Sequence, residues 1–215
     1  MLMRISVLLA AVLVLVQGCS PMPVREWPAL EGRVLDAQTE EPIEGAFVVA
    51  RWIGYGGHTQ SQCFHVDVAQ TDAQGRYRIE PWRNDQDTVY LVDQRQTVER
   101  VHKTGYRESP LTQEQRSYLR GIYYLEKDAR EVGERLEHLS GLMKSSNCYD
   151  AGKSERALYG LRAAIYYEAK SLHAPGDLLQ WMREMAASAW LAHDSSMSQH
   201  EHDEAVSDFL KGNLQ

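Results

Sequence analysis

The sequence lacks most of the motifs that mark enzymes and nucleic-acid-binding proteins. It has only three cysteines and no Cys-x-x-Cys pair, so the usual zinc-ligand spacing is missing. A Gly-x-Ser-x-Gly motif, a glycine-rich phosphate loop and a paired-carboxylate signature are missing as well. The formal net charge is -7 and no stripe of Lys and Arg stands out, which argues against a nucleic-acid partner. We therefore expect no catalytic site and no cofactor.

Apolar runs long enough to cross a membrane are also missing, but a shorter one begins the chain. Arg4 precedes an apolar run from Ile5 to Val16, and Cys19 follows shortly after it. A helix of about twelve residues rises only about 18 Å, whereas the hydrocarbon core of a bilayer is about 30 Å thick. Residues 1–18 are therefore predicted to be a secretory signal peptide rather than a permanent membrane span.

The residues around Cys19 resemble the bacterial lipobox. Gly18 suits the narrow pocket of a lipoprotein signal peptidase, whereas Gln17 departs from the small or apolar residue that is usual there. The resemblance implies cleavage before Cys19, lipidation of its thiol and a membrane partner reached through that lipid. Ser20 in place of Asp resembles lipoproteins that are sent to the outer membrane, facing the periplasm. The alternative is an ordinary signal peptide followed by a coincidental cysteine.

The other two cysteines form an even pair. In an oxidising compartment outside the cytoplasm, Cys63 and Cys148 are predicted to form a disulfide. The bridge would close a loop of about 85 residues and would stabilise the fold by roughly 4 kcal/mol in the chain-entropy model. Two free buried thiols, or two metal ligands, are the alternatives.

The rest of the chain divides into a tether, a β-rich segment, a helical segment and a tail. Residues 19–28 contain three prolines and are interpreted as a tether. Residues 29–126 have the alternation and turn signals of short strands, which favours an antiparallel sandwich. Alternate residues from Ala46 to Ala50 should face one side of a strand and those from Phe47 to Arg51 the other. The remaining strand candidates are 30–36, 63–68, 77–79, 88–92, 97–101 and 121–125.

The pattern turns helical in residues 127–192, where about three helices are expected. Asp128 and Glu131 have the spacing of a capping box at the start of the first helix. The second helix should begin near Ser154, and the third should follow Pro175 and Gly176. Residues 193–215 are interpreted as a polar tail.

A second family resemblance covers the β-rich segment. Pro42, Gly45 and the Thr71-Asp72-x-x-Gly75 turn belong to a pattern over residues 30–48 and 71–77 that resembles the carboxypeptidase regulatory-like domain. This resemblance implies a seven-stranded prealbumin-like sandwich, similar in architecture to transthyretin, and hence an α+β chain once the helices are added. In the peptidases this domain accompanies a separate zinc domain, and no His here is followed by Glu three residues later. A structural or binding module is implied, and no peptidase.

Three groups of residues are candidates for a functional site. Trp52, Tyr55 and Trp82 would offer flat faces to a carbohydrate or a protein, although core packing is the commoner fate of tryptophan. His193, His200 and His202 are weak metal-ligand candidates, and a solvated acidic tail is the favoured interpretation.

The third candidate is Cys63 with His65, whose side chains should share one face of a strand. They suggest a thiol–imidazole pair, but a disulfide with a histidine beside it is favoured. The favoured function is a non-catalytic, membrane-anchored envelope lipoprotein that acts as a scaffold or as a module binding protein or carbohydrate. The alternatives are a periplasmic metal-handling protein that uses the His-rich tail, and a hydrolase whose residues are spread through the helices.

Overall fold

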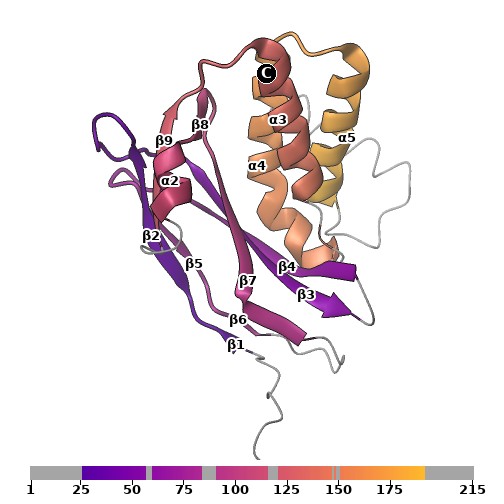
Figure 1. Ribbon diagram of the computed structural model, residues 1–215. Coiled ribbons are helices and arrows are strands. Elements are labelled where there is room, and N and C mark those ends of the chain that lie inside the picture. Colours follow the sequence, from indigo (N-terminus) through magenta and orange to yellow (C-terminus); the bar gives the residue numbers. More distant parts are fainter. Residues whose placement is uncertain are drawn as a thin grey trace, which may run out of the picture.

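The computed structural model describes residues 26–56, 60–83, 91–115, 121–146, 148 and 151–191. The predicted signal peptide 1–18, Cys19 and most of the tether lie outside these residues, as does the tail 193–215 with its three histidines. The described chain is α+β, as predicted (Figure 1). Its strands are β1 (Glu26–Trp27), β2 (Leu30–Asp36), β3 (Phe47–Gly56), β4 (Gln60–Gln70), β5 (Arg76–Ile79), β6 (Trp82–Arg83), β7 (Leu91–His102), β8 (Tyr106–Glu108) and β9 (Ile122–Lys127). Its helices are α2 (Pro110–Gln115), α3 (Val132–Ser145), α4 (Ala151–Ser171) and α5 (Gly176–Leu191).

The described strands form a four-stranded sheet, a three-stranded sheet and a small two-stranded ribbon. The four-stranded sheet has the order β5-β2-β9-β8, the three-stranded sheet has the order β4-β3-β7, and β1 pairs with β6. Every ladder is antiparallel except the one between β2 and β9, which is parallel. The expectation of a purely antiparallel arrangement is therefore wrong for this pair. Parallel neighbours need a long crossover connection, and here the intervening strands supply it.

The parallel pair depends on a close approach between two glycines. Arg33 N donates a hydrogen bond to the carbonyl oxygen of Gly121 at 2.6 Å. A Cβ atom on Gly32 would overlap that same carbonyl group, and Gly121 itself has a φ of 102°. Any larger side chain at either position would push β2 and β9 apart.

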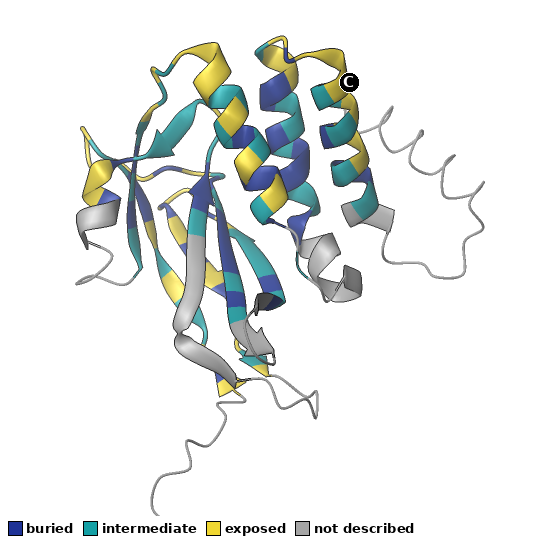
Figure 2. Ribbon diagram, turned by 45° about the vertical axis from the view of Figure 1, so that its right-hand side comes forward, coloured by how far each residue is buried: buried dark blue, intermediate teal, exposed yellow. Residues whose placement is uncertain are grey.

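The three-stranded sheet is the middle layer of the molecule. One face packs against the four-stranded sheet and the other against α3, α4 and α5 (Figure 1, Figure 2). Val48 and Ala50 of β3 belong to the core between the sheets, while Phe47 and Val49 belong to the core beneath the helices. The predicted alternation along this strand is confirmed. Both faces of β3 are apolar because both faces are covered.

The helical segment begins later than its sequence signal indicates. The residue before α3 is Glu131, which makes no side-chain capping hydrogen bond. The Asp128 carboxylate instead accepts from the backbone and the guanidinium of Arg130. The capping-box prediction is therefore wrong, because a loop arginine uses the carboxylate that the helix would have needed.

Two further differences concern element boundaries. The strands predicted at 88–92 and 97–101 are one long strand, β7, as far as the described residues show. The short elements β8 and α2 were not predicted. Within the described chain, no helix is long and apolar enough to span a bilayer.

Candidate functional site

The two predicted partner cysteines meet at the boundary between the sheet and the helices. Cys63 lies on β4 and Cys148 lies between α3 and α4, 85 residues later in the sequence. The structure joins them in a disulfide with a Cα–Cα distance of 4.9 Å. Both side chains belong to the apolar cluster beneath the helices. The bridge therefore ties the middle sheet to the connection between two helices.

A β-bulge in β4 separates the cysteine from the histidine that follows it. The register between β3 and β4 shifts after Trp52, which pairs with His65, whereas the next residue, Ile53, pairs with Cys63. Phe64 is the extra residue in this ladder. Cys63 faces the helices, and His65 packs with the tryptophans of the sandwich. The expectation that the two share a face is wrong, so they do not form a nucleophile–base pair.

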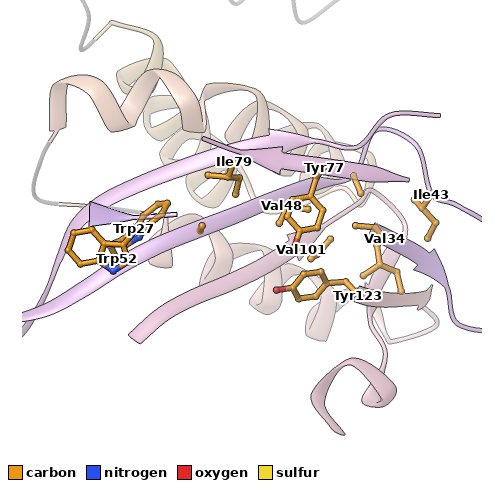
Figure 3. Packing of buried hydrophobic residues seen from close by; sticks show 12 residues of the cluster. Trp27, Val34, Ile43, Val48, Trp52, Tyr77, Ile79, Val101 and Tyr123 are labelled. Carbon is orange, nitrogen blue, oxygen red and sulfur yellow. The ribbon is translucent and has the colours of Figure 1, made fainter. Parts of the chain in front are cut away.

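An aromatic cluster occupies the end of the sandwich where β1 pairs with β6. The Trp82 ring stacks on His65 with centroids 4.8 Å apart and lies 4.6 Å from Trp27 and 5.6 Å from Trp52. Figure 3 shows Trp27 and Trp52 together at one end of the core, with Tyr77 and Tyr123 toward the other end. The four rings bury a large apolar area at low cost in side-chain entropy.

Of the three aromatic residues predicted to contact a ligand, Trp52 is a core residue. Its side chain is 1% exposed, so its ring presents no face to solvent. Trp82 is half-buried, while the side chain of Tyr55 lies outside the described residues. Trp27, which the sequence reasoning missed, is a full member of the cluster. Its position just before the first long strand was the available signal.

A polar site, unforeseen from the sequence, lies partly buried where the sandwich meets the helices. We call it the charge cluster; its members are His102, Asp128, Arg130, Arg135, His138 and Glu168. These residues come from the end of β7, the β9–α3 connection, α3 and α4. No sequence motif predicts it, because its members are single polar residues that lie far apart in the chain.

Glu168 is the centre of the charge cluster. Its Oε1 atom accepts from Arg135 Nη2 at 2.7 Å and from the backbone N–H of Gly105 at 3.3 Å. Its Oε2 atom lies 3.7 Å from Nε2 of His102, too far for a hydrogen bond. The side chains of Glu168 and His102 are each 3% exposed. A buried carboxylate is tolerated here because an arginine and a peptide group compensate it.

The loop before α3 supplies the other half of the cluster. Arg130 Nη2 donates to Asp128 Oδ2 at 2.6 Å, and Arg135 Nε lies 3.8 Å from the same oxygen. The hydrogen bonds from Arg130 keep the pKa of Asp128 below its ordinary value despite partial burial. Arg135 thus lies between two carboxylates, one from the loop and one from α4.

The two histidines of the cluster are held in the neutral form at neutral pH. Burial, with repulsion from His138 and Lys103, lowers the pKa of His102 to about 4. Burial and the charge of Arg130 lower the pKa of His138, although three nearby carboxylates oppose this. Burial destabilises the charged imidazolium by more than the nearby carboxylates stabilise it.

A second polar feature, Arg162, connects the helices to one another. Its side chain is fully buried and donates to the hydroxyl and carbonyl oxygens of Ser146 and to the carbonyl oxygen of Met185. Ser146 caps the C-terminus of α3, where the helix dipole favours a cation. Arg162 is therefore a structural clamp between α3, α4 and α5.

The residues proposed to bind a metal and the cysteine proposed to carry the lipid are not among the described residues. His193, His200, His202 and Cys19 all lie outside them. Among the residues that the structure describes, no group of three His, Cys, Asp or Glu side chains has the geometry of a metal site.

Comparison with known proteins assigns no family. No family model and no curated protein matches the chain. Among solved structures, a 9R-lipoxygenase from Cyanothece PCC8801 aligns at 14% identity over 67% of this chain and 24% of its own, with a TM-score of 0.20. At that TM-score the alignment carries no argument about fold or function.

Proposed function

We propose that this chain is a non-catalytic, exported lipoprotein, anchored by a lipid on Cys19 to a membrane of the bacterial envelope, and that it acts as a scaffold or binding module. One observation carries the proposal. Cys63 and Cys148, from different layers of the fold, lie at disulfide distance. Such bridges persist in oxidising compartments, which agrees with the export signal in residues 1–18.

The described fold supports a carboxypeptidase regulatory-like sandwich in residues 29–126. A four-stranded and a three-stranded sheet share one core, and the predicted Thr71–Gly75 turn lies between β4 and β5. In that turn, the Asp72 carboxylate accepts from two backbone N–H groups and Gly75 has a φ of 70°. If this assignment is right, the sandwich contains one parallel pair of strands, β2 and β9.

A binding role is favoured over a catalytic one by the state of the polar groups. The Asp128, Glu168 and His102 side chains of the charge cluster are each only 3% exposed, so a substrate could not reach them without opening the fold. The half-buried Trp82 is better placed to meet a protein or a carbohydrate.

The anchor is tested by producing the full chain in a bacterial host and separating the membranes. We expect acylated protein in the membrane fraction, and the variant Cys19→Ser should leave that fraction and keep its leader. Ser20→Ala is the matched control and should behave as the wild type. Unmodified Cys19 in the wild-type protein would overturn the anchor.

The binding role needs a separate experiment. Acylated protein is extracted in detergent and its partners are captured by crosslinking, with Trp82→Ala as the test variant and Trp181→Ala, on α5, as the control. Loss of the captured partner in the first variant alone supports a contact at the aromatic end. Equal capture by both variants would place the contact elsewhere.

A further inference from the structure

The charge cluster and the disulfide hold the helical layer at two separate places. Arg135 lies in the first turn of α3, whereas Cys148 follows the last turn of the same helix. The fourteen residues of α3 span about 21 Å, so the two attachments are far apart. One attachment is covalent and the other is electrostatic. Only the second can respond to protons.

The charge cluster is balanced only while its histidines are neutral. In the Arg135–Glu168 pair, and likewise in the Arg130–Asp128 pair, the positive and negative charges neutralise each other. Glu108 of β8, whose Oε1 atom accepts from the backbone N–H of Val101, and Lys103 complete the charged groups that face the histidines. The cations are Lys103, Arg130 and Arg135, and the buried or half-buried anions are Glu108, Asp128 and Glu168. The exposed Glu134 adds an anion beside Arg130 at the solvent side.

A proton added to His102 would be a buried positive charge without a hydrogen-bonded anion. Oε1 of Glu168 is already engaged by Arg135 and Gly105, and the Oε2 atom that faces His102 is 3.7 Å away. Neither that Oε2 atom nor Nε2 of His102 has a hydrogen-bond partner among the described residues. Opening the interface would let water solvate both groups.

We propose that the charge cluster is an acid-sensitive latch, which keeps the helices docked on the sandwich at neutral pH and releases them at this end when its histidines take up protons. The disulfide at the other end of α3 keeps the released helices attached. The change is therefore a local opening rather than a dissociation of the two segments. This inference stands independently of the lipid anchor.

The direction of the pH effect follows from how many protons the docked and the open states bind. The pKa of His102 is about 4 when docked, and that of a solvated histidine is about 6.5, so the open state binds more protons between these values. The docked state is fully favoured above about pH 6.5 and loses stability as the pH falls toward about 4. For His102 alone, the opening equilibrium should rise about thirtyfold between about pH 7.5 and pH 5. His138 changes it in the same direction.

Hydrogen exchange on the full chain tests the latch. Protection is measured at about pH 7.5 and pH 5 and is corrected for the intrinsic exchange rate. We expect a selective, roughly thirtyfold loss of protection at Gly105 and in the last turns of α4, while Val34 and Val48 between the sheets keep theirs. A uniform loss across both cores, or no loss, would overturn the proposal.

Two histidine variants give the matched comparison. His102→Asn removes the proton acceptor and should abolish most of the selective loss. His173→Asn changes an exposed histidine in the α4–α5 connection at a φ of 57°, which asparagine tolerates, and should leave the wild-type response. A full acid response in His102→Asn would contradict the latch.

A direct titration keeps the proposal testable if His102→Asn does not fold. The ring protons of His102 are followed by nuclear magnetic resonance in the wild-type protein. We expect His102 to remain neutral until the interface opens, at a pH below the ordinary pKa of about 6.5 of a solvated histidine. A folded protein in which His102 takes up its proton near or above 6.5 would overturn the proposal.

Discussion

The two faces of the middle sheet are held by different kinds of interaction. Toward the four-stranded sheet, the contacts are aliphatic and aromatic, from Trp27 and Trp52 at one end to Tyr123 and Leu125 in β9. Toward the helices, the apolar cluster is supplemented by a disulfide and by the charge cluster. The first interface depends on burial alone, whereas the second also depends on redox state and pH.

The docking of the helices can therefore change with pH or redox state while the sandwich stays folded. Apolar burial changes little over the pH range in which histidines titrate. A buried histidine takes up a proton as the pH falls, and a disulfide is broken by a sufficiently strong reductant. We expect the sandwich to be the constant part of the structure and the docking of the helices to be the variable part.

The largest effect is expected from the sandwich core. Trp52→Ala should lower the free energy of unfolding by up to about 5 kcal/mol, because it empties a site that is 1% exposed. Denaturant unfolding with and without a reductant measures this, and the loss should be the same in both. Trp82→Ala, at the half-buried neighbour, should cost less. A small loss in Trp52→Ala would show that the aromatic end is loosely packed.

The next effect concerns the covalent link to the helices. Replacing both Cys63 and Cys148 by Ser should lower stability by roughly 4 kcal/mol, because the bridge closes a loop of 85 residues. Hydrogen exchange should show the loss first in α3 and α4, with the sheet core following. Mass spectrometry of the non-reduced wild-type protein is the control. Free thiols there would remove the basis of this prediction.

The third effect is expected from the charge cluster. Glu168→Gln should lower the free energy of unfolding by about 3 kcal/mol, because it leaves the half-buried Arg135 without its closest anion. Thermal unfolding at neutral pH measures the loss. The double variant Glu168→Leu with Arg135→Met should recover much of it, since a matched apolar pair leaves no buried charge. If the double variant is as unstable as the single one, the pair contributes more than mutual compensation.

The smallest effect is expected from an exposed pair on the outer sheet. Glu31 and Arg78 form an ion pair across the β2–β5 ladder, with more than half of each side chain exposed. Glu31→Gln should change the free energy of unfolding by less than about 1 kcal/mol, and salt should reduce even that. Unfolding at low and high ionic strength is the measurement. A loss as large as that of Glu168→Gln would invalidate the distinction between buried and exposed pairs.

The parts of the fold that follow from local pattern were predictable. The alternation around Val48 and Val49 predicted which residues share a face of β3, because side chains along a strand alternate with a period of two. The turn at Thr71–Gly75 was predictable from Asp72 and Gly75. Helices α4 and α5 were recognisable from their apolar spacing.

The parts that depend on distant residues were not predictable. The bulge at Phe64 leaves no mark in the sequence, so Cys63 and His65 appeared to share a face. Asp128 looked like a helix cap because its competitor, Arg130, acts only once the loop is folded. The charge cluster brings His102 and Glu168 together across two layers, and neither residue has a motif of its own.

The pairing of β2 with β9 has a consequence for how the chain reaches its native state. Arg33 of β2 meets Ile122 of β9 about 90 residues later, and contacts of such long range slow folding. The sheet cannot close around its core until most of the polypeptide has been synthesised. We expect nascent chains that end before Gly121 to remain protease-sensitive, a state suited to passage through a secretion channel, and pulse proteolysis of stalled chains would detect it.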